Sequence, residues 1–241
     1  MPASDLNELS EFLSKTWSRD SIMALAQFIP MAIAQPVAQV TGSRALAESL
    51  LRVSQLADGY RTVTRLSGLV DTLKPSRING IATIPQPLIR QIATAEAVMS
   101  LGFFPTEHLA LFTKFGILPA GDKNFQHYST LAVFFWFWGL LLKTVRLSIM
   151  WVAKRNQLNG SEDATSAALK RQLKSIQMQL VSTVCYLIFS MTCVSAKARL
   201  FRSGPLMPIN VLFETLSPPR LELPLAVRGL LGTIASSVDF L

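Results

Sequence analysis

Charged residues are scarce in this chain of 241 residues. Asp, Glu, Lys and Arg together make up only 16% of it, whereas half of the residues are hydrophobic. A soluble domain usually carries about a quarter charged residues, so this sequence has too little charge to cover an ordinary water-facing surface. The excess apolar surface must face lipid, a partner, or both, and we expect an integral membrane protein.

The residue types that metal binding and catalysis need are also scarce. Two cysteines, Cys185 and Cys193, lie eight residues apart, which on a helix is about 12 Å and too far for a disulfide. The two histidines, His108 and His127, have no cysteine nearby and make no metal-ligand pattern. No glycine-rich phosphate loop, nucleophile elbow or zinc-protease motif is present. We therefore expect no enzyme activity, no metal and no cofactor.

Basic residues outnumber acidic ones, with 23 Lys+Arg against 15 Asp+Glu. In a membrane protein this excess is most simply explained by basic residues that flank apolar segments and meet anionic lipid headgroups. Nucleic-acid binding is the alternative, but the basic residues stand mostly singly or in pairs and form no Lys/Arg-rich tract. We expect anionic membrane lipid as the partner, and no nucleic acid.

Two long apolar segments give the strongest membrane signal. Residues 131–152 and 175–196 are each long enough to cross a hydrocarbon core of about 30 Å as a helix, and 153–175 are expected to form a basic loop between them. Together they predict a transmembrane helical hairpin. Lys143 and Arg146 interrupt the first segment; they either snorkel, pair with an acid, or line a pore for anions.

The N-terminal region predicts two helices, and the second has several possible placements relative to a membrane. Residues 5–17 predict a short helix, and a second helix is expected from Asp20 or Ser18 toward Val40. This second helix lacks charge after its start, and its two internal prolines are expected to kink it. A transmembrane span, an interfacial helix and a buried bundle helix are all open, and the glutamines along one side favour the interface.

Residues 43–74 form the clearest amphipathic segment. Apolar residues recur there every three or four positions, and Ser43 is the expected N-cap. The apolar stripe shifts near Gly59, where a bend would cost little. The segment is either a bundle helix with solvated arginines or a basic amphipathic helix that lies on anionic lipid. In the second case the membrane-binding residues are Arg44, Arg52, Val53, Leu56, Tyr60, Arg61, Arg65 and Lys74.

Between this segment and the hairpin, glycine and proline predict interruptions. Residues 75–87 hold three prolines and a glycine and are expected to form a loop. We expect a helix over 88–101, a break at 102–105, and a further helix over 106–118.

The chain closes with a proline-rich connector at 204–224 and an apolar segment at 225–241. The apolar segment is short for a span, so we expect a third membrane-embedded or half-inserted helix. Gly229, Gly232 and Ser236 place small residues one turn apart, on a face that lets another helix approach closely. We expect this face to serve helix packing and homo-oligomer contacts.

The whole sequence therefore predicts an all-α integral membrane protein. It should have N-terminal amphipathic helices, a transmembrane helical hairpin and a short C-terminal membrane helix. We divide it into an amphipathic helical region, 1–125, and a membrane-embedded helical region, 126–241.

Three stretches, in order along the chain, resemble the peroxin-11 family of peroxisomal biogenesis proteins. Arg19 and Asp20, followed by hydrophobic residues and Gln27, are similar to the family's N-terminal R-D-K-hydrophobic-Q-Y opening. Ser21 replaces the basic residue of that opening and Phe28 replaces the tyrosine. Residues 107–118 are similar to its segment of an acid, histidine, an aromatic residue, lysine and glycine, and 229–237 to its G-hydrophobic-hydrophobic-G-T-x-S-S ending. The aromatic span most resembles the kinetoplastid branch, the glycosomal integral membrane proteins.

The resemblance implies residence in the peroxisomal (glycosomal) membrane as a multi-pass protein. It also implies self-association and the elongation of the organelle membrane before division. A pore for small metabolites is the alternative function. A passive scaffold that recruits organelle-division factors is a third possibility.

Overall fold

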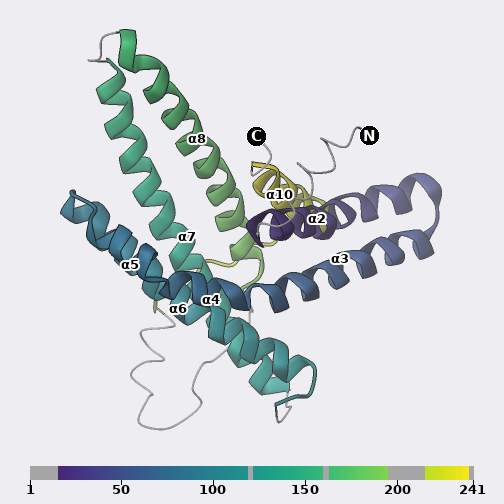
Figure 1. The fold of residues 1–241 in the computed structure, drawn as a ribbon. Helices are drawn as coiled ribbons and strands as arrows, with labels where there is room; N and C mark the ends of the chain where they lie inside the picture. Colours follow the sequence, from purple (N-terminus) through teal and green to yellow (C-terminus); the bar gives the residue numbers. More distant parts are fainter. Residues whose placement is uncertain (1–15, 119–121, 160–162, 195–214, 239–241) are drawn as a thin grey trace, which may run out of the picture. The chain divides into compact units, whose positions relative to one another are not determined.

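The computed structural model describes residues 16–118, 122–159, 163–194 and 215–238 (Figure 1). Regular structure within these ranges is helical, with no strand, as the all-α prediction requires. The chain divides into two compact units. The first unit is Met1–Arg65 with Leu223–Leu241, and the second unit is Leu66–Glu222. The helix expected over 5–17 lies almost entirely outside the described residues.

The first unit is built from α2 (Thr16–Thr41), α3 (Arg44–Thr64) and α10 (Leu225–Ser237), with α2 packed against the other two. A tight turn joins α2 to α3. Gly42 has a φ of 67°, a conformation that glycine adopts without steric cost. Ser43 is the N-cap of α3, as predicted, because its hydroxyl accepts a hydrogen bond from the Leu46 amide at 3.3 Å.

Helix α2 runs through both of its prolines, Pro30 and Pro36, to Thr41. Its segment Asp20–Thr41 is long and apolar enough to cross a membrane. By length and composition α2 therefore qualifies as a transmembrane span, the first of the three placements that the sequence left open.

The second unit contains α4 (Leu66–Leu73), α5 (Pro75–Ala82), α6 (Pro87–Lys114), α7 (Asp122–Asn159) and α8 (Asp163–Thr192). The loop predicted at 75–87 is wrong over most of its length, because 75–82 are helical. Pro75 opens α5 at a position where a helix needs no amide hydrogen, and its fixed φ suits the first turn. Helix α3 is continuous through Gly59 and ends at Thr64, and α4 begins at Leu66.

Helix α6 is continuous, so the break predicted at 102–105 is also wrong. Pro105 removes one backbone hydrogen bond, yet α6 stays helical through it and packs against α7. Gly102 lies against the ring of Phe135, where an added Cβ would come within 2.6 Å of ring atoms. Phe103 stacks on Trp136 with ring centroids 6.3 Å apart. These contacts hold α6 antiparallel to α7.

The two predicted spans lie inside longer helices. Residues 131–152 fall within α7, and 175–196 fall within α8 as far as Thr192. Segments Asn124–Asn159 and Ala167–Thr192 are long and apolar enough to cross a membrane. The basic loop predicted at 153–175 is wrong at both ends, because α7 continues to Asn159 and α8 begins at Asp163.

Trp136 joins the helices of the second unit. Its ring lies 6.3 Å from that of Tyr186 and 6.1 Å from that of Phe189, both on α8. On the same helix, Trp138 Nε1 donates a hydrogen bond to the Leu216 carbonyl in the connector at 2.9 Å. The aromatic run of α7 thus supplies packing contacts within the unit as well as an apolar span.

The compact units do not follow the division at 125–126, because α10 packs with α2. That division separates amphipathic from membrane-embedded segments, and it stays a prediction about the membrane.

Candidate membrane-binding surface

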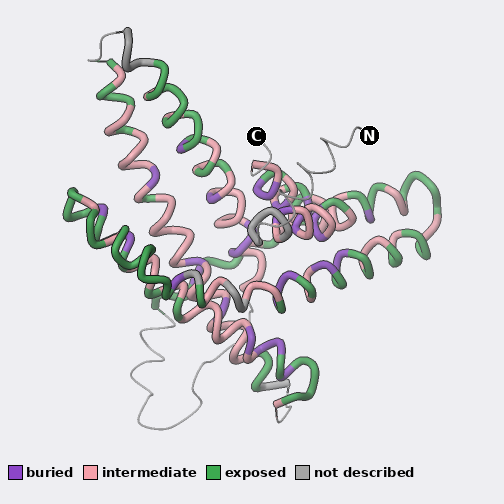
Figure 2. Tube along the Cα trace, in the orientation of Figure 1, coloured by how far each residue is buried: buried purple, intermediate pink, exposed green. Residues whose placement is uncertain are grey.

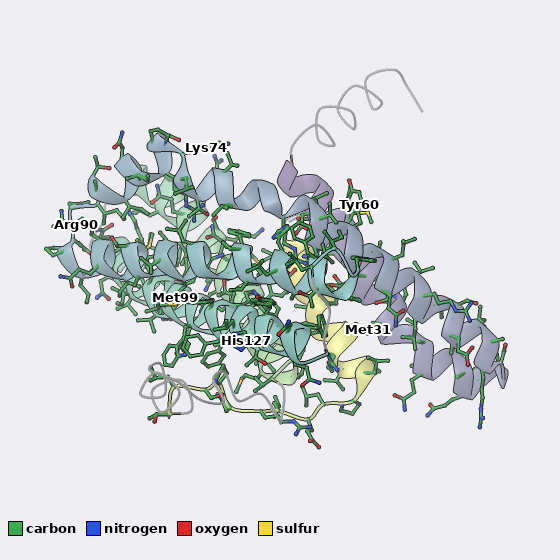
Figure 3. All side chains as sticks on the ribbon, turned by 90° about the horizontal axis from the view of Figure 1, so that it is seen from below. Met31, Tyr60, Lys74, Arg90, Met99 and His127 are labelled. Carbon is green, nitrogen blue, oxygen red and sulfur yellow. The ribbon has the colours of Figure 1, made fainter. Side chains whose placement is uncertain are left out.

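Helix α3 turns a stripe of large apolar side chains outward. The members recur at spacings of seven, three, four and three residues, so they share one side of the helix. Leu56 is 77% exposed and Val63 is 58% exposed, and Tyr60 projects from the helix (Figure 3). We call this set the α3 stripe: Leu46, Val53, Leu56, Tyr60 and Val63.

The side of α3 that is buried carries small and polar residues. The buried residues are Ser54, Ala57, Arg61 and Thr62, and Figure 2 shows buried and exposed positions following one another along the helix. An amphipathic helix of a water-soluble protein buries its apolar stripe instead. A row of exposed large apolar side chains marks a surface that meets lipid or another protein.

The other helices of the first unit show the same distribution. Small residues make up much of its interior, together with Phe28 and Gln27; the small residues are Ala24, Ala34, Ser21, Gly229, Gly232, Ala235 and Ser236. Large apolar residues lie outside, including Ile29 and Ile33 on α2 and Val227, Leu230 and Ile234 on α10. Small residues between helices with large apolar residues around them are typical of helices packed in a membrane.

The predicted basic residues occupy different environments. Arg44 and Arg52 are exposed on α3, and Arg52 forms only a loose ion pair of 4.0 Å with the exposed Glu48, which contributes little. Arg65 is half-buried at the end of α3, where its Nε donates to the Arg61 carbonyl at 3.3 Å. Lys74 is exposed and belongs to the second unit.

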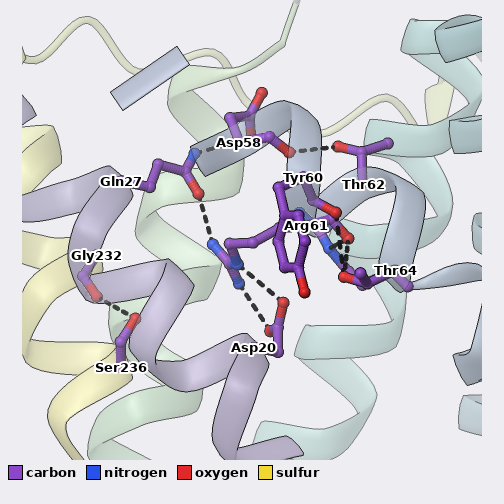
Figure 4. Close-up of polar contacts among 10 residues, drawn as sticks. Asp20, Gln27, Asp58, Tyr60, Arg61, Thr62, Thr64, Gly232 and Ser236 are labelled. Atoms are coloured by element: carbon purple, nitrogen blue, oxygen red, sulfur yellow. Dashed lines mark hydrogen bonds and ion pairs between the residues drawn. The ribbon is translucent and has the colours of Figure 1, made fainter. Parts of the chain in front are cut away.

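Arg61 is the exception, because its side chain is buried against α2. It is 7% exposed, and its Nε and Nη2 donate to the two carboxylate oxygens of Asp20 at 2.9 and 3.0 Å (Figure 4). Nη1 donates to Gln27 Oε1 at 2.6 Å. We therefore correct the membrane-binding assignment of Arg61: a guanidinium engaged on α2 is withdrawn from headgroups, since burial requires that its charge be paired.

The pair belongs to a larger polar cluster between α2 and α3. Gln27 Nε2 donates to Oδ1 of Asp58, a residue of α3, at 2.8 Å. The Arg61 guanidinium also lies over the ring of Phe28, 5.5 Å from its centroid, a cation–π contact that is strongest when the cation is desolvated. Charge-assisted, bidentate hydrogen bonds of this kind fix orientation as well as adding energy.

The small face of α10 packs against α2 of the same chain. An added Cβ at Gly229 would lie 2.6 Å from the Ala32 Cα, and one at Gly232 would lie 2.6 Å from a carbon of the Phe28 ring. Ser236 Oγ donates to the Gly232 carbonyl at 2.8 Å, within α10 (Figure 4). The predicted use of this face between copies of the chain is a separate contact and stays a prediction.

Of the two cations in the apolar segment of α7, Arg146 has an acidic partner on α6. Its Nε and Nη2 donate to the two carboxylate oxygens of Glu96 at 2.5 and 3.0 Å, and both side chains are largely buried. Pairing with an acid was one of three placements that the sequence left open. Lys143 is half-buried on the same helix.

Sequence reasoning missed Glu96 and the pairing role of Asp20. A signal for the first was present, because Glu96 is the only charged residue between Arg90 and Glu107. A single acid in an otherwise uncharged stretch of helix needs a cation from elsewhere when that stretch is buried.

The second unit holds the remaining titratable residues that the sequence singled out. His108 is buried, and its Nδ1 lies 2.7 Å from the Phe104 carbonyl one turn earlier. No disulfide joins Cys185 and Cys193. Across the described ranges, no group of three or more His, Cys, Asp or Glu residues is placed to hold a metal ion.

The comparison with known families agrees with the resemblance. The family model for peroxisomal biogenesis factor 11 (PEX11) matches residues 6–199, most of the chain. No curated protein and no solved structure matches it. Two of the three resembling stretches, those at Arg19 and at 107–118, lie inside the match, and 229–237 lies beyond it. The chain belongs to the peroxisomal biogenesis factor 11 family.

Proposed function

We propose that this protein shapes and elongates the peroxisomal membrane and so promotes proliferation and division of the organelle. The observation that carries the proposal is the α3 stripe, whose large apolar side chains face outward while the side that carries Ser54, Ala57 and Arg61 packs on α2. Family membership supports a role in peroxisome biogenesis, and the stripe suggests how that role is exerted.

An apolar helix face at a membrane surface sinks about 5–10 Å into the boundary between headgroups and acyl chains. It occupies area in one leaflet and not in the other, which favours curvature. Arg44 and Arg52, exposed on the same helix, add attraction to anionic headgroups. Helix α2, which is long and apolar enough to span, tethers α3 to the bilayer.

The finer aspects of the proposal follow from this arrangement. Copies of the chain in one membrane concentrate the area difference, so we propose that it acts as a homo-oligomer. Segments of the chain exposed to the cytosol are the sites at which organelle-division factors are recruited. The glycosomal branch is the narrower assignment, and it rests on the aromatic span. A metabolite pore has less support, since Arg146 is paired with Glu96.

Two neighbouring residues of α3 allow a matched test. Leu56 lies on the stripe, whereas Gln55 is exposed outside it. In vesicles of phosphatidylcholine and phosphatidylserine, the full-length protein should produce tubules that electron microscopy counts. Leu56→Asp should remove most of them, because a carboxylate in the apolar boundary opposes insertion, whereas Gln55→Asp adds the same charge and should leave tubulation near the parent level. Equal tubulation by Leu56→Asp and the parent would refute the proposed function.

A further inference from the structure

Basic residues gather at the end of the α7–α8 hairpin where α7 ends and α8 begins. Beyond the apolar segment of α7, which ends at Val152, the helix carries Lys154 and Arg155, and α8 carries Lys170, Arg171 and Lys174 before its apolar segment begins. Arg155 and the three basic residues of α8 are exposed. Because α7 and α8 are helical here and not a loop, these side chains have fixed levels along the hairpin.

The ring contact of Trp136 with Phe189 sets the register of the two helices. Lys154 lies 18 residues after Trp136 on α7, and Arg171 lies 18 residues before Phe189 on α8. At about 1.5 Å per residue, both are about 27 Å from the contact, and Arg155 and Lys170 are matched one residue further out. Four cations therefore stand at nearly one level, and Lys174 is level with Trp151.

This level lies just beyond the hydrocarbon. Lys154 follows Val152, the last residue of the predicted span, by two positions, or about 3 Å of helix. Trp151, over whose ring the Arg155 guanidinium lies at 5.0 Å, is a residue type enriched at the membrane–water boundary. Among the residues that the structure describes, no acid forms an ion pair with these cations.

We propose that Lys154, Arg155, Lys170, Arg171 and Lys174 form a binding site for the headgroups of anionic phospholipids. We call it the hairpin-end collar. Phosphate and carboxylate groups of such lipids lie at this level of a bilayer and carry the opposite charge, and each Lys or Arg near the surface is worth roughly a five-fold gain in association. The collar is independent of the α3 stripe, so it binds lipid whether or not the protein deforms membranes.

The full-length protein in bilayers tests the collar directly. Spin-labelled phosphatidylserine should associate more strongly than spin-labelled phosphatidylcholine, as measured by the motionally restricted fraction in electron spin resonance. Changing Lys154, Arg155, Lys170 and Arg171 together to Gln should lower this preference by at least about two-fold. The matched control changes four exposed cations outside both the collar and the α3 surface, Arg77, Arg90, Lys114 and Arg220, to Gln and should lower it less.

A second measurement needs no substitution. A phosphatidylserine with a photoactivatable headgroup should form adducts with peptides that cover 151–174, and 1 M salt should reduce them, because such contacts are screened. Adducts confined to other helices, or a control variant that loses as much preference as the collar variant, would overturn the proposal. If the protein prefers phosphatidylserine as expected but does not form tubules, only the proposed function is overturned.

Discussion

Arg61 on α3 and Asp20 on α2 form a bidentate ion pair across 41 residues of sequence, with the arginine side chain only 8% exposed. The pair sets which side of α3 is buried. With Arg61 turned toward α2, the α3 stripe is left on the outside. The same guanidinium lies over Phe28, whose ring also contacts Gly232 of α10. One aromatic side chain therefore touches both partners of α2.

We predict that the pair of Arg61 and Asp20 stabilises the fold through both its opposite charges and its bidentate geometry. Arg61→Gln leaves a carboxylate without its cation and should lower the free energy of unfolding by up to about 3 kcal/mol, since Asp20 is one-third exposed and partly solvated. Arg61→Lys keeps the charge but loses the two-pronged geometry and should cost less. Thermal unfolding in detergent ranks the variants, and the double exchange Asp20→Arg with Arg61→Asp should recover part of the loss. If Arg61→Gln unfolds with the parent, the pair does not hold α3.

Replacing either of two helical glycines by alanine should change the stability of the protein, in opposite directions at the two positions. Gly232→Ala should destabilise the first unit, because its Cβ would overlap the Phe28 ring. Gly59→Ala meets nothing within 4 Å and should stabilise α3 by about 1 kcal/mol through helix propensity. The unfolding temperature of the two variants should move in opposite directions. A similar shift for both would contradict the close packing of α10 on α2.

The pair of Glu96 and Arg146 should behave as a coupled unit. Changing either residue alone to Gln leaves a largely buried charge unpaired and should cost about 3 kcal/mol or more, whereas the double change should cost much less than the sum. A double-mutant cycle on the unfolding free energy measures the coupling. Additive losses would show that the two charges act separately.

The same residues bear on the pore alternative. A paired arginine presents no free charge to a permeating anion, so Arg146→Gln combined with Glu96→Gln should leave the ion selectivity of reconstituted planar bilayers unchanged. A shift of selectivity toward cations in this variant would show instead that Arg146 lines a conducting path.

The apolar spans and the amphipathic stripe were readable from the sequence because both depend on composition and local period. Residues 131–152 form a helix as predicted, and the N-cap at Ser43 follows from local chemistry. The continuity of α6 was not readable, because Pro105 alone predicts a break, and the contacts that keep the helix together come from Phe135 and Trp136 on α7.

Arg61 shows the same limit within the candidate surface. Its spacing on α3 places it among the other arginines, and a helical period does not distinguish a solvated guanidinium from a buried one. Only the approach of Asp20 and Gln27 from α2 does so. The apolar period along α3 was recognised, but which of its side chains turn outward depends on this tertiary contact, and Ala57, which shares that period, is buried.

The location of the α3 stripe in the membrane tests the account most directly. In a background with Cys185 and Cys193 changed to Ala, Leu56→Cys and Gln55→Cys place single thiols on adjacent residues of α3. In intact vesicles, a membrane-impermeant thiol reagent added to both sides should label Gln55→Cys fast and Leu56→Cys at least about ten-fold more slowly, since the acyl region excludes the reagent and the reactive thiolate alike. In detergent-free, denatured protein the two should react alike. Equal labelling of both thiols in intact vesicles would place the stripe in water and contradict the proposed mechanism.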